Sequence, residues 1–472
     1  MLDFDKLAAK NILVIGDVIL DKFCFGKVTR FTPDAPVPII KTEKILNSPG
    51  GAGNVANNIA SLGANATVIG FTGTDYHYHD IKQSLEKMDI NALLIQTQNP
   101  TITKANIIGE NADGETQKMF RLDTECTDYE ETDYKQLIST IEENISTADA
   151  VIISDYQKGV CTTEVCKMII HTCKENNIPV LVDPKGKDWR KYTGATLIKP
   201  NLKELSVISD KAITESPEDV VNFGKKVRST YNLSHLVVSQ SSQGVLCISE
   251  NGHFNLAASA TDVKDVIGAG DAMIATLGCC LAIQMNIREA AEIANHSSGI
   301  VVEKVGTVPI RKTDLELSAY KTNTKLIKNL VAFVSNIKDK YNKIVFTNGC
   351  FDIIHKGHLT HLKQARAYGD VLIIGLNSDA SVKKLRGKNR PINTFEDRRD
   401  VLAGFEFVDF VVEFDDETPL ELIKAIRPDV LVKGGNYTTD EVVGKEFAQE
   451  TQILPLLEGY STNEIIKTMT EE

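Results

Sequence analysis

NILVIGD, the stretch at residues 11–17, decides the fold because four consecutive apolar residues are followed by Gly16 and Asp17. Continuous rather than alternating hydrophobicity is typical of a strand that is buried on both faces of a parallel sheet. The pattern recurs, each time ending in polar or glycine residues, with helical segments between the runs. The recurrences are AVIISD (150–155), PVLVDPKG (179–186), TLIKPN (196–201), HLVVSQ (235–240), KIVFTNGCFD (343–352), DVLIIGLNSD (370–379), VDFVVEFDD (408–416) and DVLVKGGNY (429–437). The sequence therefore predicts an α/β protein with parallel sheets, whose ligands bind beyond the carboxyl ends of the strands.

The composition excludes several classes of protein. The 472 residues include 52 Lys and Arg against 64 Asp and Glu, which gives a formal net charge of −12. This acidic balance argues against binding to nucleic acid, and no run approaches the roughly 20 apolar residues of a membrane span. No signal peptide is expected, because the N-terminal stretch has no apolar segment with a cleavage site. Nine scattered cysteines without a CxxC motif indicate reduced thiols and a cytoplasmic protein.

A change of pattern near residues 311–341 indicates a boundary between two domains. The stretch lacks glycine, proline and strand-like runs, and its apolar residues follow one helical stripe between residues 326 and 337. We expect a first domain at 1–317, a connecting helix at 318–340 and a second domain at 341–472. The stripe is compatible with packing inside the chain or with a homodimer contact, so the oligomeric state stays open.

DVIGAGDA (265–272) runs into an apolar helical segment and is the first candidate for chemistry. Backbone amides around Gly268, Ala269 and Gly270, at the start of a helix, would form an anion hole for a phosphate group. Asp271 would then accept a proton from an attacking hydroxyl. The alternative is an ordinary glycine-rich helix start, with Asp271 stabilised by the helix dipole.

PGGAGNVANNIASLGA (49–64) is a second glycine-rich segment that runs into a helix. Its residues 51–56 fit the G-x-G-x-x-A dinucleotide pattern, but NSP rather than a strand precedes it, which disfavours an NAD site. Asp17 and Asn54 are suited instead to hold sugar hydroxyls. SDYQKG (154–159) and DPKG (183–186) each bring an acid and a lysine to a strand end, where a lysine could also be plain surface charge.

Together with GDVILDKF, PVPI and KPNLKE, these motifs resemble the ribokinase-like (pfkB-type) carbohydrate kinases across residues 10–310, and within them the heptose 7-phosphate kinases. The resemblance implies that Asp271 is the catalytic base and that Gly268, Ala269 and Gly270 form the anion hole. It also implies an ATP and Mg²⁺ region and a sugar region. The ATP and Mg²⁺ residues would be Asn201, Leu202, Lys203 and Glu204, and the sugar residues Asp17, Gly50, Gly51, Asn54 and Lys185, the lysine near the substrate phosphate. Two positions depart from the family: Ile267 replaces a threonine, and Gln240 stands where a basic residue is expected.

TNGCFDIIHKGHLTHL (347–362) follows a predicted strand and opens a helix. His355 and His358 at the helix N-terminus can bind nucleotide phosphates and stabilise charge on leaving pyrophosphate. With His361 they are also spaced three apart, which suggests a metal site as an alternative, but no carboxylate follows at a spacing that zinc would need. We therefore expect no metal site made by the protein alone and a surface position for His361.

The HxGH element resembles the cytidylyltransferase-like nucleotidyltransferases, and NSDASVKKLRG (377–387), RPIN (390–393), EDRRDVL (396–402), VKGGNY (432–437) and YSTNEII (460–466) narrow the match to heptose adenylyltransferases. The resemblance implies transition-state stabilisation by His355 and His358, and substrate hydroxyl binding by Asp352. The implied nucleotide-binding residues are Thr347, Gly349, Phe351, Arg398, Ser461 and Thr462. Ser461 also begins an S-x-x-E capping box, and the two roles are compatible. Asn436 replaces a family aspartate, and Leu457 stands where related enzymes carry an arginine.

The two resemblances imply a ribokinase-like α/β sandwich followed by a smaller Rossmann-like HxGH nucleotidyltransferase domain. Such a protein would phosphorylate C1 of D-glycero-β-D-manno-heptose 7-phosphate with ATP and Mg²⁺. After a separate phosphatase removes the 7-phosphate, it would transfer AMP from ATP to heptose 1-phosphate, giving ADP-heptose for lipopolysaccharide core biosynthesis. Its partners would be sugar phosphates and ATP, without nucleic acid or membrane; a monovalent cation near the kinase loop is left open. The alternatives are another sugar phosphate or heptose stereoisomer, a non-catalytic nucleotide-binding scaffold, and an NAD oxidoreductase.

Overall fold

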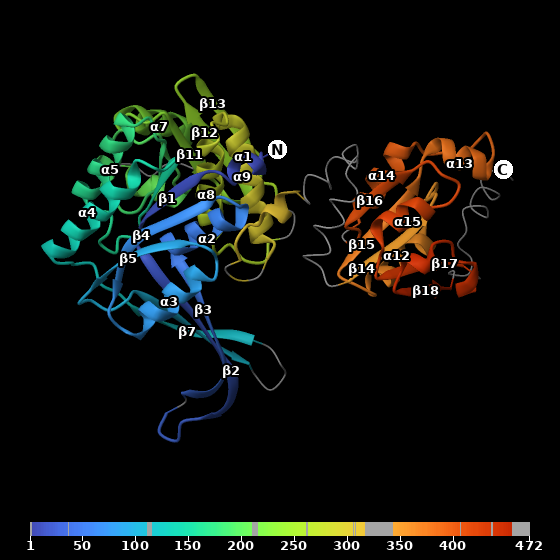
Figure 1. The fold of residues 1–472 in the computed structure, drawn as a ribbon, viewed down its shortest axis with the longest axis horizontal. Coiled ribbons are helices and arrows are strands. Elements are labelled where there is room, and N and C mark those ends of the chain that lie inside the picture. Colours follow the sequence, from blue (N-terminus) through green and yellow to red (C-terminus); the bar gives the residue numbers. More distant parts are fainter. Residues whose placement is uncertain are drawn as a thin grey trace. The chain divides into compact units, whose positions relative to one another are not determined.

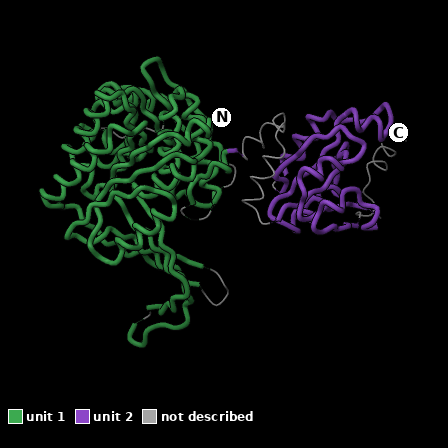
Figure 2. The backbone as a smooth tube through the Cα atoms, viewed as in Figure 1, with its two compact units in different colours: residues 1–315 green, residues 316–472 purple. Residues whose placement is uncertain are grey.

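The structure, a computed structural model, divides the chain into unit 1 (Met1–Leu315) and unit 2 (Glu316–Glu472), coloured separately in Figure 2. It describes residues 2–35, 37–110, 116–209, 216–260, 263–304, 306, 308–316, 343–405, 407–435 and 438–455. The helix predicted for 318–340, with its apolar stripe, lies outside the described residues.

Unit 1 is built on a nine-stranded sheet, as far as the chain is described (Figure 1). Seven strands are parallel, and an antiparallel hairpin forms one edge. In spatial order the strands are β13 (Gly252–Leu256), β12 (Val245–Ser249), β11 (His235–Ser239), β10 (Leu197–Ile198), β9 (Val180–Asp183), β8 (Ala150–Ser154), β1 (Asn11–Gly16), β4 (Asn65–Gly73) and β5 (Asn91–Thr97).

Helices cover both faces of this sheet, because its central strands are apolar on both sides. In β1, Ile12 and Val14 join one hydrophobic cluster, whereas Leu13 and Ile15 join the other. The first cluster draws on α1 (Phe4–Leu7), α2 (Ala52–Leu62), α3 (Tyr76–Glu86), α8 (Ala269–Ala282) and α9 (Ile287–Val302). The second draws on α4 (Glu131–Ile145), α5 (Thr163–Glu175), η1 (Trp189–Tyr192), α6 (Leu202–Val207) and α7 (Pro217–Thr230). The remaining short turn of this unit is η2 (Ser241–Gln243).

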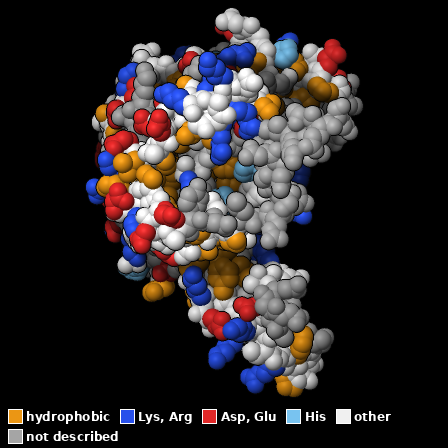
Figure 3. Space-filling model, turned by 90° about the vertical axis from the view of Figure 1, so that its right-hand side faces the viewer, with side chains coloured by type: hydrophobic (Ala, Val, Ile, Leu, Met, Phe, Trp, Pro, Cys, Tyr) orange, Lys and Arg blue, Asp and Glu red, His pale blue; other side chains and the backbone are white. Residues whose placement is uncertain are grey.

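A second sheet of unit 1, the projecting sheet, extends away from the body of the unit (Figure 1). The sequence analysis did not predict it. Its strands, in spatial order, are β3 (Pro38–Gly51), β2 (Val18–Phe31), β6 (Thr103–Glu110) and β7 (Thr116–Thr124). In the space-filling view, hydrophobic side chains lie among charged ones on its far end (Figure 3).

The expectation that no strand precedes the glycine-rich segment at 49–64 is wrong, because β3 runs through Gly51 directly into α2. Pro49 is tolerated there since β3 is an edge strand, where a missing backbone N–H breaks no ladder on the open side. The strand pairs antiparallel with β2 and belongs to the projecting sheet, so the β-α-β context of a dinucleotide site is still not formed.

Unit 2 contains a five-stranded parallel sheet in its described part. The order is β16 (Phe410–Phe414), β15 (Val371–Asn377), β14 (Ile344–Gly349), β17 (Val430–Gly434) and β18 (Glu450–Leu454). Hydrophobic clusters on the two faces involve α15 (Leu420–Ile426) on one side, and α12 (Lys356–Arg366) and α14 (Phe395–Ala403) on the other. The other helical segments are α13 (Asp379–Arg386), η4 (Thr439–Glu441) and η5 (Lys445–Phe447). The strand order reverses between β14 and β17, which is where open α/β sheets bind ligands.

The predicted two-domain α/β fold is thus confirmed, and each of the nine quoted runs contains a strand. Among the described helices, none combines the length and apolar character needed to cross a membrane. All nine cysteines are described and are free thiols.

We expect the Ile152→Ala substitution to destabilise unit 1 by about 2–5 kcal/mol, because it opens a cavity in a closed core. Ile152 is fully buried in β8 and faces α8 so closely that a Cβ built on Gly278 would lie 2.7 Å from its Cδ1. Urea unfolding followed by circular dichroism measures the loss. Val207→Ala, at a position 45% exposed, should change stability by no more than about 0.5 kcal/mol. Equal effects of the two substitutions would contradict this account of the core.

Candidate active sites

Four charged side chains follow neighbouring parallel strands at the carboxyl edge of the main sheet of unit 1. Asp17 follows β1, Asp155 follows β8, Asp183 ends β9 and Lys199 follows β10. Asp17, Asp155 and Lys199 are nearly inaccessible to solvent. Asp155 and Asp183 are each held by an ion pair with a lysine. Because buried charges must be paired or hydrogen-bonded, this edge needs a dense polar network.

Asp271, the predicted base, lies in the first turn of α8, after Gly268 with its left-handed φ of 83°. One carboxylate oxygen accepts a hydrogen bond of 2.6 Å from the Asn54 side-chain amide, and the other accepts one of 2.8 Å from the Tyr156 hydroxyl. Burial raises the pKa of Asp271, although both hydrogen bonds and the Lys199 ammonium favour its charged form. The expected pairing of Asn54 with sugar hydroxyls stays a prediction; in the structure this amide holds the base.

The predicted anion hole at Gly268, Ala269 and Gly270 opens α8 directly beside a buried ammonium group. Lys199 is 3% exposed, and its Nζ lies 3.0 Å from Asp183 Oδ1. A Cβ built on Gly270 would lie 3.3 Å from the same Nζ, so the ammonium packs against the loop. Burial acts to lower the pKa of Lys199, but Asp183 and nearby carboxylates raise it, and the group stays positively charged.

The predicted ATP and Mg²⁺ residues lie at the start of α6. Asn201 and Glu204 form a capping box, with each side chain accepting a hydrogen bond from the other's backbone amide at 2.8 and 2.9 Å. Glu204 also accepts a hydrogen bond of 2.7 Å from Lys185, which was predicted to hold the substrate phosphate. Leu202 packs against the second hydrophobic cluster of unit 1, and Lys203 is exposed.

Asp17, predicted to face the sugar, is fully buried beneath the loop that follows β8. Its carboxylate accepts hydrogen bonds from the backbone amides of Tyr156, Lys158 and Val160 at 2.7, 3.0 and 3.1 Å. Burial and the neighbouring Asp155 raise the pKa of Asp17 to about 6. In the structure Asp17 therefore braces this loop, and its contact with a sugar stays a prediction.

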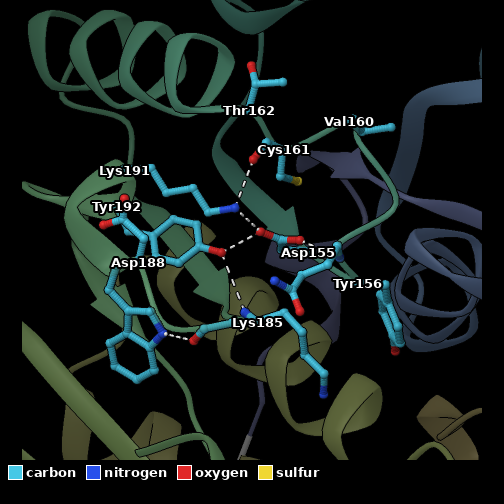
Figure 4. Close-up of polar contacts among 12 residues, drawn as sticks. Asp155, Tyr156, Val160, Cys161, Thr162, Lys185, Asp188, Lys191 and Tyr192 are labelled. Atoms are coloured by element: carbon cyan, nitrogen blue, oxygen red, sulfur yellow. Dashed lines mark hydrogen bonds and ion pairs between the residues drawn. The ribbon is translucent and has the colours of Figure 1, made fainter. Parts of the chain in front are cut away.

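Figure 4 shows the second brace of the loop, in which Lys191 and Tyr192 converge on Asp155. Lys191 also donates to the carbonyl of Cys161 at 2.9 Å. The Asp155 carboxylate additionally accepts a hydrogen bond from the Gln157 amide at 2.7 Å. Both braces act on the stretch that carries Tyr156.

The other predicted kinase positions lie around this network. Gly51 directly precedes α2 with a left-handed φ of 57°, and a Cβ on Gly50 would lie 2.4 Å from an Asp21 carboxylate oxygen. Ile267, the first departure from the family pattern, is 49% exposed ahead of the loop. Gln240, the second, is buried and starts a turn with Gly244.

A cavity of about 600 Å³ lies at the carboxyl ends of β14 and β17 in unit 2. Of the predicted residues, Gly349, Phe351, Asp352, His355 and His358 line it. His355 is the N-cap of α12, and its ring stacks on that of His358 with 4.0 Å between the ring centres. Phe351, which has a left-handed φ of 44°, also packs on His358, with 5.1 Å between the ring centres and the rings tilted by 55°.

The expectation of a surface position for His361 is wrong. This imidazole lines the cavity, and its Nε2 lies 3.1 Å from Oγ1 of Thr347, which is itself 1% exposed. Burial lowers the pKa values of both His358 and His361 to about 4, assisted by the neighbouring histidines and by Lys433 respectively. Both rings are therefore neutral near pH 7, and neutral imidazole N–H groups can donate hydrogen bonds to phosphate oxygens.

Arg398, predicted to neutralise phosphate, is 1% exposed and does not line the cavity. Its guanidinium donates to the carbonyls of Cys350 and Asn393 at 2.6 and 3.2 Å and to the Asp379 carboxylate at 2.8 Å. In the structure Arg398 braces the surrounding loops, because its N–H groups donate to protein carbonyls and a carboxylate and not into the cavity. Cations that do line the cavity are Arg386, Arg390 and Lys433.

Asp352, predicted to bind substrate hydroxyls, is 3% exposed and engages the RPIN segment. One carboxylate oxygen accepts hydrogen bonds from the amides of Ile392 and Asn393 at 2.7 and 3.1 Å, and the other pairs with Arg390 at 2.5 Å. Its contact with substrate stays a prediction. Ser461, Thr462, Asn436 and Leu457 lie outside the described residues. No group of three or more His, Cys, Asp or Glu side chains in the described part of the chain is arranged to hold a metal ion.

Sequence reasoning missed several residues at the two sites. Tyr156 lies in the quoted SDYQKG motif, but only the acid and the lysine were considered there. Lys199 begins KPNLKE and Lys433 lies in VKGGNY, so both stood in quoted motifs without a role. His361 follows His358 by three residues, and that spacing places both side chains on one helix face.

Comparison with known proteins gives a consistent result for both units. Residues 9–314 match the pfkB family of carbohydrate kinases, and residues 346–468 match the cytidylyltransferase-like family. The bifunctional protein HldE of Aliarcobacter butzleri is 40% identical over 98% of both chains. The bifunctional protein HldE of Campylobacter jejuni strain RM1221 is 40% identical over the full length of both. Phosphofructokinase-2 from Escherichia coli, solved in complex with potassium, shares the fold with a TM-score of 0.55 and 22% identity; the match covers 65% of this chain and 97% of that one.

We expect acid to destabilise unit 2 through its buried histidines. The pKa of His361 is about 4 in the folded protein and about 6.5 when unfolded, so the unfolded state binds more protons between these values. The stabilisation is complete above pH 6.5 and is lost as the pH falls toward 4. Urea unfolding at pH 7 and pH 5 should show a fall in stability that is smaller in His361→Asn. The exposed His253 provides a control, because His253→Asn should retain the parent's pH dependence; identical pH dependence in all three proteins would contradict the prediction.

Proposed function

The chain belongs to the bifunctional HldE family, in which a pfkB-type carbohydrate kinase domain precedes a cytidylyltransferase-like nucleotidyltransferase domain, and on this premise we propose its two reactions. Unit 1 phosphorylates C1 of D-glycero-β-D-manno-heptose 7-phosphate, giving the 1,7-bisphosphate. Unit 2 transfers AMP from ATP to heptose 1-phosphate, giving ADP-heptose and pyrophosphate. The product feeds lipopolysaccharide core biosynthesis, and both reactions take place in the cytoplasm.

One observation carries the proposal: each unit has its candidate reactive side chains in the first turn of a helix that begins beyond a parallel sheet. Asp271 is the third residue of α8; His355 is the N-cap of α12, and His358 is the third residue of that helix. At such a helix start, backbone amides and the helix dipole favour bound phosphate. A base beside an anion hole suits phosphoryl transfer, and imidazoles beside cavity cations suit the departure of pyrophosphate.

In the kinase reaction, Asp271 accepts the proton of the anomeric hydroxyl as its oxygen attacks the γ-phosphorus of ATP. The bond from the γ-phosphorus to the bridging oxygen breaks, and ADP leaves. Amides at Gly268, Ala269 and Gly270 stabilise the charge on the transferred phosphoryl group, and the Lys199 ammonium adds to the positive field behind Gly270. Asn54 and Tyr156 hold the base in place.

Mg²⁺ would neutralise charge on the ATP phosphates. The side chains that would hold this ion are the carboxylates of Asp183 and Glu204. Carboxylate oxygens fit Mg²⁺, which is commonly held by one or two carboxylates together with phosphates and water. In the structure Asp183 is ion-paired with Lys199; burial raises its pKa to about 6, and a bound cation would favour its charged form. A monovalent cation near the kinase loop is part of the proposal because phosphofructokinase-2 from Escherichia coli was solved with potassium.

In the adenylyl reaction, an oxygen of the sugar 1-phosphate attacks the α-phosphorus of ATP, and pyrophosphate leaves with the bridging oxygen. His355 and His358 donate hydrogen bonds to phosphate oxygens, while Arg386, Arg390 and Lys433 supply positive charge around the cavity. His361 fixes the Thr347 hydroxyl within β14. No covalent enzyme intermediate is required.

We expect Asp271→Asn to lower sugar phosphorylation at least about a hundredfold and to spare adenylyl transfer, because only the base is removed. His358→Asn should do the opposite, with a loss of about 10²–10³-fold in adenylyl transfer. Mass spectrometry of the products from heptose 7-phosphate or heptose 1-phosphate with Mg-ATP measures each reaction, and each variant is the control for the other. Loss of both reactions in one variant would refute independent sites. Unchanged heptose 7-phosphate with the parent protein would refute the substrate and direct the assay to other phosphosugars.

The proposal includes a homodimer that covers an apolar row on the projecting sheet. Ile45, Cys24, Ile107 and Phe120 are direct neighbours across the four strands and therefore share one face. Ile45 and Phe120 are 55% and 56% exposed, and Leu122 on the same face is 63% exposed. Such a patch on a monomer marks a contact surface.

Sedimentation equilibrium tests the homodimer. The parent should sediment as a dimer at micromolar concentration, and Phe120→Glu combined with Leu122→Glu should sediment as a monomer. Val207→Glu adds one glutamate at another exposed position of unit 1 and should leave the dimer intact. A monomeric parent would refute the proposed homodimer.

A further inference from the structure

We propose that Tyr156 is a positioning residue for the kinase base, holding the Asp271 carboxylate in its ionised form and in one orientation. The inference rests on the proposed function of Asp271. Tyr156 donates its hydroxyl to Oδ1 of Asp271 at 2.8 Å, and Asn54 donates to Oδ2 at 2.6 Å. Each carboxylate oxygen has two lone pairs, so one remains free on each oxygen to accept the proton of a substrate hydroxyl.

The loop that carries Tyr156 is fixed on both sides, which makes the position of its hydroxyl definite. The Tyr156 amide donates to Asp17 at 2.7 Å, and two further amides of the loop share the same carboxylate. Asp155, directly before Tyr156, is held by Lys191 and Tyr192 (Figure 4). The carboxylates of Asp17 and Asp155, at the ends of β1 and β8, thus fix the position of the loop. The loop in turn fixes the position of the Tyr156 phenol.

The ring of Tyr156 is held from the projecting sheet as well. The Lys104 Nζ of β6 lies 5.1 Å from the centre of this ring, a cation–π contact. Tyr156 therefore connects the projecting sheet to the base, with the Lys104 contact on its ring and the Asp271 contact on its hydroxyl.

Burial and hydrogen bonding act on Asp271 in opposite directions. Burial disfavours the carboxylate, whereas hydrogen bonds donated to it favour the charged form that a base needs. The Tyr156 phenol keeps its own proton, since burial and the neighbouring carboxylates raise its pKa well above the ordinary value. It therefore acts as a permanent donor to Asp271. Removing the hydroxyl should raise the pKa of Asp271 and leave the anion hole intact.

The test is the pH dependence of kcat/KM for sugar phosphorylation by the full chain, from pH 5 to pH 9. In Tyr156→Phe we expect the acid limb to move upward by about one pH unit. Above that limb the variant should retain activity within about tenfold of the parent. Ionisation of the substrate phosphate is common to every protein compared and cancels. Tyr134→Phe is the matched control, because the Tyr134 hydroxyl donates to the Gly159 carbonyl at 2.9 Å and touches the loop without touching Asp271; its acid limb should stay at the parent's position.

An acid limb of Tyr156→Phe at the parent's position would overturn the inference. So would a loss of phosphorylation at every pH in a variant whose thermal unfolding matches the parent's, since that outcome makes the phenol indispensable rather than positioning. Equal shifts in Tyr156→Phe and Tyr134→Phe would assign the effect to the loop and would also overturn it. Asp271→Asn is assayed alongside: activity retained in that variant counts against the proposed base itself, and this result is distinguishable from failure of the inference about Tyr156.

Discussion

A carboxylate removed from water must be paired or hydrogen-bonded, and the kinase unit depends on this constraint at four positions. Asp17, Asp155, Asp183 and Asp271 lie at or near the carboxyl edge of the main sheet, where Asp155 acts on Asp17 and Asp271 acts on Asp183 through their charges. Each is satisfied in a different way. Asp17 takes three backbone amides, Asp155 a lysine and a tyrosine, Asp183 a buried ammonium, and Asp271 an amide and a phenol.

The second unit meets a related constraint with neutral groups. Its imidazoles are partly buried beside cavity cations, and burial keeps them uncharged near neutral pH. The nearby carboxylate and guanidinium, Asp352 and Arg398, are used mainly to fix the loops around the cavity. Arg386, Arg390 and Lys433 thus place positive charge at the cavity wall, whereas Arg398 braces the protein behind that wall.

The sequence allowed the two-domain α/β fold to be predicted because the central strands are buried on both faces and show unbroken apolar runs. The projecting sheet was not predicted, since its strands mix charged and apolar residues and expose much of their surface. Residues in the two candidate sites were found through local motifs, but their partners were not. Asn54 and Asp271 are 217 residues apart, and no local sequence pattern predicts their contact. Whether an arginine faces a cavity, as Arg386 does, or is enclosed, as Arg398 is, depends on packing that spacing alone does not specify.

Each unit buries hydrophobic clusters of its own on both faces of its own sheet. The information needed to build each catalyst is therefore contained in a continuous portion of the sequence. For inheritance this means that a genome can carry the two activities on one gene or on two. Recombination near the boundary between the units can exchange one unit without disturbing the hydrophobic core of the other.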